Sequence, residues 1–280
     1  MKDKWDSRIY LELYAGAGYA RIRGSSKLIA GSPLRALLVR DPFDKYVFCE
    51  EIPDKLAALK KRVSRLAPVA NVDYVEGKCD LHKDEILAGI PRGSKGNTAL
   101  TLCFADPFDI GLKFETIRTL AESRYVDFLI TLALGMDANR NYEHYVKEDA
   151  SKIDEFLGST TWRKRWATAQ WDAVRFTKFL AGEFTKSMAT LDYIPPPSYT
   201  MKEVRSSEKN LRLYSLALFS RHELYFKLHV LPKQLRALMK LRSLPIVLGS
   251  GLGLRSTTSK KENILSILWS LKISGVVQQK

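Results

Sequence analysis

Four short loops along the chain carry residue types that can hold a nucleoside. Glu12 opens the first loop, which ends in Gly16-Ala17-Gly18, where the lack of side chains lets the backbone approach a ligand. Glu50 ends an apolar run, a position from which one carboxylate accepts both hydroxyls of a ribose. Asp80 ends Gly77-Lys78-Cys79-Asp80 and can accept from an adenine amino group, and Asp106-Pro107-Phe108 is the fourth loop. Each of these residues is as commonly a cap, a turn or a packing residue, but their order along the chain predicts a nucleoside pocket.

The spacing of the loops indicates which nucleoside. No lysine follows the glycines at the spacing of a phosphate-cradling loop, and Glu50 lies 50 − 18 = 32 residues after Gly18, against about 20 in dinucleotide binders. S-adenosylmethionine has no phosphates and needs contacts only to adenine, ribose and an amino acid. We therefore expect S-adenosylmethionine as the cofactor and no metal, with these candidate contacts: Glu12, Ala15, Gly16, Gly18, Glu50 and Asp80.

The elements that position these loops alternate between strands and helices. Apolar runs predict five strands, and Ser32 as a cap before Pro33, and Pro53, mark the starts of two of the helices. Such an alternation predicts a parallel, doubly wound α/β sheet, because short right-handed crossovers leave few other topologies, and ligands of such sheets bind at the carboxyl ends of the strands. The strands are expected at Ile9–Tyr14, Tyr46–Glu50, Val72–Val75, Leu100–Ala105 and Val126–Leu134.

The chain changes character after residue 137. Residues 138–197 are predicted to form a basic helical insertion, and Tyr199–Arg205 and Leu211–Phe219 then predict a β-hairpin. An antiparallel hairpin added to five parallel strands is the arrangement of a Rossmann-like class I methyltransferase, whose seventh strand inserts beside the fifth. We expect residues 1–137 to be the cofactor-binding half, residues 198–243 the closing hairpin and helix, and residues 244–280 a basic tail with the pattern of a winged-helix fragment.

Charge is distributed unevenly. Residues 1–150 hold 23 Lys and Arg against 22 Asp and Glu, and residues 151–280 hold 22 against 9, so that +1 and +13 make up the total of +14. Such a basic half favours a nucleic-acid partner, DNA or RNA, because basic side chains release condensed counterions; a solvated surface is the alternative. Interleaved aromatic and basic residues predict nucleic-acid contacts, although the tryptophans equally fit a buried helical stripe. The predicted contacts are Trp162, Arg163, Lys164, Arg165, Arg175 and Lys178.

Three cysteines bear on the compartment. Cys49, Cys79 and Cys103 form no Cys-x-x-Cys pair and no even set, which favours reduced thiols in a cytoplasmic protein. Cys103 lies within a predicted strand and no Pro-Cys pair occurs, so we expect a core residue and not the nucleophile of a cytosine C5 methyltransferase. The N-terminus lacks the apolar core of a signal peptide, and the longest uncharged apolar run, 128–136, is shorter than the ~18 residues of a membrane span.

Taken together, the motifs resemble those of one family. The pattern of five motifs is similar to that of the three-Cys-motif partner proteins, which are bacterial and phage-associated and have a class I methyltransferase fold. The five motifs are the loop from Glu12 to Gly18, Gly31-Ser32-Pro33-Leu34, Phe48-Cys49-Glu50, Gly77-Lys78-Cys79-Asp80 and Asp106-Pro107-Phe108. The resemblance covers residues 5–135, and Asp109 departs from it because the family prefers glycine there. It implies a methyltransferase-like pocket and a three-Cys-motif protein as partner.

The fourth loop also resembles the Asp/Asn-Pro-Pro-Tyr/Phe loop of amino-methyltransferases, without the second proline. This implies that Asp106 and the Pro107 carbonyl accept from the amino group of a flipped base while Phe108 stacks on it. Alternatively, Asp106 caps the next helix and Phe108 packs into the sheet. The sequence thus predicts an S-adenosylmethionine-dependent methyltransferase acting on a base amino group. The alternatives are a non-catalytic module that binds nucleic acid or the three-Cys-motif partner, and an enzyme that uses the adenosyl group differently.

Overall fold

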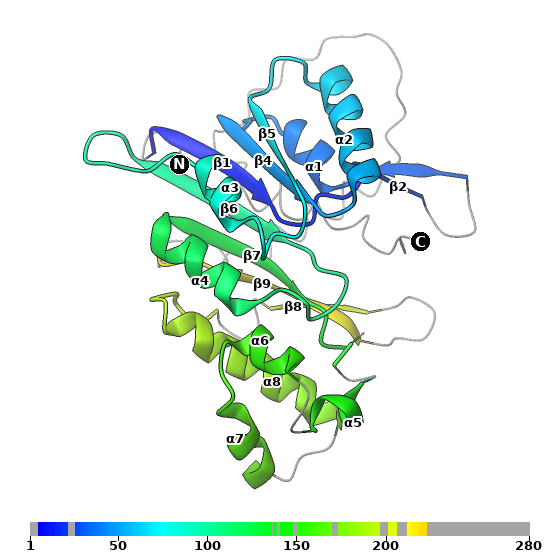
Figure 1. The fold of residues 1–280 in the computed structure, drawn as a ribbon, viewed down its shortest axis with the longest axis vertical. Helices are drawn as coiled ribbons and strands as arrows, with labels where there is room; N and C mark the ends of the chain where they lie inside the picture. Colours follow the sequence, from blue (N-terminus) through cyan, green and yellow to red (C-terminus); the bar gives the residue numbers. More distant parts are fainter. Residues whose placement is uncertain are drawn as a thin grey trace, which may run out of the picture.

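The computed structural model describes residues 5–21, 26–135, 137–138, 141–147, 151–169, 173–196, 201–205 and 212–222. Within them a seven-stranded sheet runs through the molecule, with helices packed against it (Figure 1). The expected helix after the hairpin and the basic tail lie outside the described residues. In the described part of the chain, no helix has the length and hydropathy that crossing a membrane requires.

The strand order of the sheet is β5-β4-β1-β6-β7-β9-β8. The predicted five parallel strands are confirmed, as β1 (Ser7–Glu12), β4 (Lys45–Glu50), β5 (Val72–Glu76), β6 (Ala99–Ala105) and β7 (Val126–Leu132). The predicted hairpin is confirmed as β8 (Lys202–Arg205) and β9 (Arg212–Phe219), and β9 runs antiparallel beside β7. The fold is that of a Rossmann-like class I methyltransferase.

Helices cover the sheet where apolar residues recur at helical spacing. Helices α1 (Ser32–Leu37) and α2 (Pro53–Leu66) have proline in the first turn, as expected, and α2 buries Leu56, Leu59 and Val63 along one face. Helix α3 (Lys83–Ala88) follows β5, and α4 (Phe114–Ser123) follows β6. Leu34 of α1 and Leu59 of α2 lie in a core with Tyr10 and Phe48, whereas α3 and α4 contribute to a second core.

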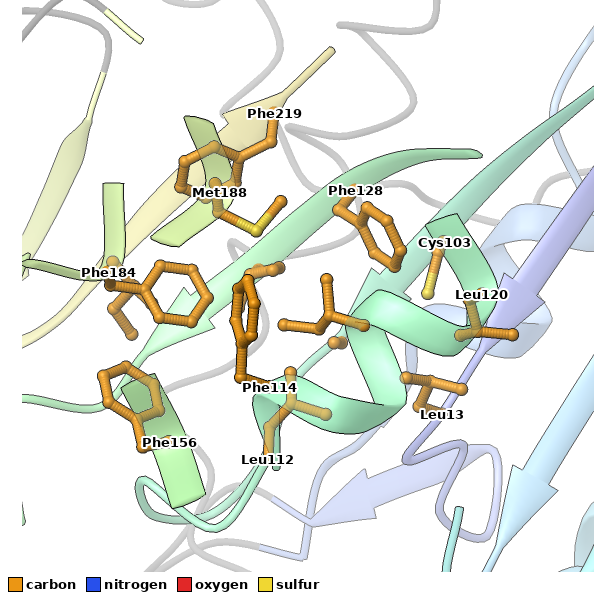
Figure 2. Close-up of a cluster of buried hydrophobic side chains, with 14 of the residues drawn as sticks. Leu13, Cys103, Leu112, Phe114, Leu120, Phe128, Phe156, Phe184, Met188 and Phe219 are labelled. Carbon is orange, nitrogen blue, oxygen red and sulfur yellow. The ribbon is translucent and has the colours of Figure 1, made fainter. Parts of the chain in front are cut away.

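The described residues between β7 and β8 are mostly helical, and they share this second core with the sheet. They contain α5 (Tyr142–Tyr145), α6 (Lys152–Leu157), α7 (Trp162–Ala169) and α8 (Ala173–Ala189). The buried ring of Phe184 on α8 lies 4.7 Å from the ring centroid of Phe156, 6.2 Å from that of Phe114 and 5.7 Å from that of Phe219 (Figure 2). These contacts connect α8 to α6, α4 and β9, so the helices are part of the same packed unit as the sheet.

Cys103 belongs to this second core. Its side chain is fully buried on β6, among the apolar side chains shown in Figure 2. Burial raises the pKa of the Cys103 thiol well above its ordinary value, which keeps the thiol protonated. The expectation of a core residue is therefore confirmed.

Candidate functional site

The four predicted loops follow the carboxyl ends of β1, β4, β5 and β6 and lie along one edge of the sheet. Because β1 is hydrogen-bonded to both β4 and β6, the glycine loop occupies the middle of this carboxyl edge. The carboxylates at this edge act on one another. Burial is the largest cause that raises the pKa of Glu12, and the negative charges of Asp106 and Glu50 raise it further. The structure thus brings together residues that are far apart in sequence.

Glu50 holds the glycine loop with its side chain. The backbone N–H of Gly16 donates to Oε2 of Glu50 at 2.7 Å, and that of Ile52 donates to Oε1 at 3.0 Å. The N–H of Ala15 donates to the carbonyl of Cys49 at 2.9 Å. Each carboxylate oxygen of Glu50 retains a second lone pair and can still accept from a ribose hydroxyl, whereas the N–H groups of Ala15 and Gly16 are already used within the protein.

Gly18 is tightly packed and has a backbone conformation that favours glycine. Its φ is +86°, and a Cβ would lie 2.9 Å from Cδ1 of Leu59 and 3.1 Å from Cγ of Leu34. The Gly18 carbonyl accepts from the N–H of Gly31 at 2.7 Å. An antiparallel pair that the sequence analysis does not predict, β2 (Tyr19–Arg21) with β3 (Leu28–Ala30), returns the chain to this contact. The Gly31-Ser32-Pro33-Leu34 motif therefore supports the glycine loop.

Glu12 is not positioned to touch a cofactor. Its side chain is fully buried and accepts hydrogen bonds from the hydroxyls of Tyr10, at 3.0 Å, and Ser32. Burial raises its pKa well above the ordinary value, although both hydroxyls act in the opposite direction. The prediction of a direct contact is wrong, because the carboxyl group is enclosed by its protein partners and ties α1 to β1. Ser32 accordingly does not cap α1, whose cap position is Gly31.

Asp80 lies in a small polar cluster beside α4. It accepts a hydrogen bond from the Thr116 hydroxyl, and the Cys79 Sγ lies 3.6 Å from the Tyr14 hydroxyl. Burial first, and then Cys79 and Asp80, raise the pKa of Tyr14, so its phenol stays protonated. Thr116 fixes the orientation of Asp80, which is partly exposed and remains a candidate adenine contact. Tyr14 lies within the first loop, but neither Tyr14 nor Thr116 was predicted to be a site residue.

The Asp106-Pro107-Phe108 loop leaves β6 with its aromatic ring in solvent. Phe108 is 76% exposed, Pro107 is buried and Asp106 is partly exposed. Helix α4 begins only at Phe114, with Lys113 at the cap position and no side-chain capping bond. The alternative in which Asp106 caps the helix and Phe108 packs into the sheet is therefore wrong. An exposed phenylalanine beside a carboxylate is what a base-stacking loop requires.

Tyr214 of β9 adds a phenol near this loop, which the sequence analysis did not single out. Its side chain is mostly buried, and burial and then the charge of Asp106 raise its pKa to about 12. Because β9 runs antiparallel beside β7, Tyr214 lies toward the carboxyl edge and not the opposite one.

A lysine fixes the far end of the same loop. The Nζ of Lys152 donates to Oδ2 of Asp109 at 2.7 Å and to Oδ2 of Asp137 at 3.1 Å. Asp137 also accepts from the N–H of Ile110 at 3.0 Å and from the hydroxyl of Tyr145 at 2.8 Å. Burial lowers the pKa of Lys152, but hydrogen bonds to Asp109, Tyr145 and Asp137 outweigh it and raise the pKa above its ordinary value. Asp109, which departs from the family pattern, thus anchors the loop to α6.

The tryptophans of α7 are core residues. Trp162 is 1% exposed and its Nε1 donates to Oδ1 of Asp154 at 2.7 Å. Its ring and that of Trp166 lie 5.9 and 4.8 Å from the ring centroid of Phe176. The prediction that Trp162 stacks on a nucleic-acid base is wrong, because its ring is enclosed by the helices. The alternative, a buried helical stripe, is correct for both Trp162 and Trp166.

The basic residues of the same segment divide into paired and exposed ones. Arg163 forms an ion pair with Asp154, and Arg165 forms one with the buried Glu183. Lys164 and Lys178 are exposed, and the side chain of Arg175 lies outside the described residues. Of the predicted contacts, the two lysines therefore remain the best candidates to meet a phosphate.

The likenesses of this chain to known proteins are distant. No protein-family model and no curated protein matches the chain. Among solved structures, the O-methyltransferase TomG from Streptomyces achromogenes, in complex with SAM, aligns at TM-score 0.38 and 14% identity over 77% of this chain and 74% of its own. Trm1 from Pyrococcus horikoshii, in complex with S-adenosyl-L-methionine, aligns at TM-score 0.39 and 11% identity over 79% of this chain and 53% of its own. The yhhF protein of Escherichia coli aligns at TM-score 0.27 and 18% identity over 46% and 59%.

The chain thus spans less than two thirds of the length of the E. coli and P. horikoshii proteins. Within the described residues, no three His, Cys, Asp or Glu side chains gather in a way that could hold a metal ion.

Proposed function

We propose that the protein is an S-adenosylmethionine-dependent methyltransferase that acts on the exocyclic amino group of a nucleic-acid base. The observation that carries the proposal is the exposed ring of Phe108 beside Asp106, at the carboxyl edge of a sheet with methyltransferase strand order. The cofactor supplies an electrophilic methyl group. Glu50 accepts from the ribose hydroxyls and Asp80 accepts from the adenine amino group, while the absence of a Cβ at Gly18 lets the loop pack closely.

On the acceptor side, Phe108 stacks on the base, and Asp106 and the Pro107 carbonyl accept from its amino group. These bonds would orient the nitrogen lone pair toward the methyl group that a bound cofactor would supply, and the amino group would release a proton to water. Orientation of two bound reactants supplies most of the acceleration. Lys152 holds the loop for this purpose through Asp109 and Asp137.

A second candidate function is a non-catalytic module of the same fold that binds nucleic acid or a three-Cys-motif protein in the cytoplasm. One observation favours it. The groups expected to face a cofactor are partly used inside the protein, since Glu12 is fully buried and the Gly16 N–H is bound to Glu50.

Calorimetric titration with S-adenosylmethionine and S-adenosylhomocysteine separates the two. We expect micromolar binding that Glu50→Ala weakens at least tenfold (~1.4 kcal/mol), because a bidentate charge-assisted contact is lost. Glu51→Ala, at the neighbouring exposed position, is the control and should bind normally. Transfer of labelled methyl groups to DNA or RNA, lost in Phe108→Ala with cofactor affinity intact, would then support the acceptor role. Absence of cofactor binding by folded protein would overturn the enzyme and leave the module.

A further inference from the structure

A hollow of about 770 Å³ lies at the amino edge of the sheet, opposite the carboxyl edge. Trp5, Thr98 and Tyr125 come just before β1, β6 and β7, and Arg221 follows the antiparallel β9, so that all four meet at this end. Arg92, Lys95 and Arg124 complete a lining in which basic side chains predominate. Neither the cofactor loops nor the Asp106 loop reaches this edge.

The two partly buried arginines of the hollow bond to neutral groups. Arg124 donates through Nε, Nη1 and Nη2 to the carbonyls of Ile90, Ser123 and Leu87, at 2.8 to 2.9 Å. Arg221 donates to the carbonyls of Leu191 and Ala121, both at 3.0 Å. A guanidinium has five N–H donors, so both arginines retain donors for a further ligand. Carbonyl oxygens satisfy hydrogen bonds without cancelling the charge.

The basic residues of this hollow differ from others in the fold in their ion pairing. Arg8, Arg163 and Arg165 each form an ion pair with an acid elsewhere in the fold. Within the described residues, by contrast, Arg92, Lys95, Arg124 and Arg221 form none. Three acids are near: Asp6, whose carboxylate accepts from the N–H and the hydroxyl of Thr98, the exposed Glu122 on the rim, and the buried Asp127, whose charge acts on Arg221. Burial and then the positive charge of Arg92 lower the pKa of Arg124, which shows that like charges gather here.

Aromatic rings stand beside these charges. The rings of Trp5 and Tyr125 are 4.9 Å apart at 42°, and both side chains are partly exposed in the lining. Helix capping explains Arg124 and Arg221, which bond carbonyls at the C-terminal ends of α3 and α4 and just after α8. It does not explain the exposed Arg92 and Lys95. Cations outside ion pairs, next to partly exposed rings, are a combination that binds single-stranded nucleic acid, whose phosphates need positive charge and whose bases stack.

We propose that the hollow at the amino edge binds single-stranded nucleic acid, with Arg92 and Lys95 at its phosphates and a base against Trp5. This site has the same class of partner, nucleic acid, as the proposed function. It does not depend on the cofactor, and it lies at the opposite edge of the sheet. A seven-residue strand such as β6 separates the edges by roughly 20 Å, so nucleotides held here flank a base presented to Asp106.

The test is fluorescence anisotropy of labelled oligo-dT and oligo-U of about 15 nucleotides, a length within the range of known single-strand sites, with the full chain at several salt concentrations. The double variant Arg92→Glu/Lys95→Glu should bind at least tenfold more weakly, and its log–log salt slope should shrink by about 1.4, because two phosphate contacts are lost. Lys61→Glu/Arg65→Glu, on the exposed face of α2, makes the same change in net charge and is the control. Equal losses in both variants would overturn the proposal.

Two further measurements separate its parts. Trp5→Leu should weaken oligonucleotide binding at least threefold and leave binding of inorganic polyphosphate unchanged, whereas an equal effect on both probes would remove base stacking from the proposal. Arg92→Glu/Lys95→Glu should bind S-adenosylhomocysteine like the wild type, and Glu50→Ala should bind oligonucleotide like the wild type. A wild-type protein that binds oligonucleotide but not S-adenosylhomocysteine would count against the methyltransferase and not against this site.

Discussion

The backbone N–H of Gly16 donates to Oε2 of Glu50 across 2.7 Å and so joins the loop after β1 to the end of β4. Glu50 is 7% exposed, and its second oxygen accepts from Ile52. The carboxylate that is proposed to bind the ribose therefore also shapes the loop that approaches the cofactor. A substitution at Glu50 should affect both stability and affinity.

The stability part is testable without a ligand. Glu50→Ala should lower the free energy of unfolding by about 1–3 kcal/mol, because the N–H groups of Gly16 and Ile52 lose their acceptor in a buried place. Glu51→Ala removes only an exposed contact to Lys78 and should cost less than about 1 kcal/mol. Urea denaturation of both variants measures the difference. Equal losses would mean that Glu50 does not support the loop.

Gly18 and Gly96 separate the effect of crowding from that of backbone conformation. Both have a positive φ, +86° and +90°, but a Cβ at Gly18 would meet Leu59 and Leu34, whereas one at Gly96 would have no atom within 4 Å. Gly96→Ala should cost about 1 kcal/mol from the left-handed conformation alone. Gly18→Ala should cost about 1–3 kcal/mol more, because overpacking is added. Thermal denaturation compares them, and equal costs would refute the close packing of Gly18.

Asp127 should make stability depend on pH. Burial raises the pKa of Asp127 to about 6, against hydrogen bonding by Ser220 and the charge of Arg221, and its Oδ1 has no hydrogen-bond partner among the described residues. The folded state therefore holds a proton that the unfolded state has lost, so stability falls as pH rises from about 4 to about 6. Asp127→Asn should stabilise the protein above pH 6 by about 1–2 kcal/mol and have little effect near pH 4.

Urea denaturation at pH 4, 6 and 8 checks this expectation. Asp54→Asn, at an exposed position on α2, makes the same change in charge and is the matched control. An Asp127→Asn curve parallel to that of the wild type would show that Asp127 titrates alike in the folded and unfolded states.

The helical segment offers a test of its own for nucleic-acid contact. Lys164→Glu/Lys178→Glu should weaken oligonucleotide binding and reduce the salt slope by about 1.4, with no change in thermal midpoint, because both side chains are exposed. Arg163 and Arg165 are unsuitable for this test, because replacing them with glutamate would place negative charges against Asp154 and Glu183 and destabilise the fold. The control is again Lys61→Glu/Arg65→Glu. An unchanged salt slope would show that Lys164 and Lys178 are solvated and do not contact the nucleic acid.

The sheet was predictable because its strands are continuous apolar runs separated by strong helix signals. The ends were less so: Leu13 and Tyr14 continue the apolar pattern of β1, but the strand ends at Glu12, where the chain turns into the glycine loop. The β2–β3 pair has three residues in each strand, too few for an alternating pattern to show.

The candidate site was predictable as a set of loops and less so as a set of orientations. Strand order alone brings Glu50, Asp80 and Asp106 to one edge. Which way a side chain turns depends on partners elsewhere in the chain, as with Glu12, which is enclosed by Tyr10 and Ser32, and with Lys152, which lies 43 positions from Asp109. Trp162 shows the same limit, since its burial depends on α8.

The place of β9 between β7 and β8 determines when the sheet can be finished during synthesis. β7 ends at Leu132 and its partner β9 begins at Arg212, so 79 residues intervene before the apolar edge of β7 can be paired. Until then that edge is open to strands of other chains. Nascent or truncated chains that stop before β9 should therefore self-associate. Pairing of β9 with β7 should be the step that protects the chain from aggregation.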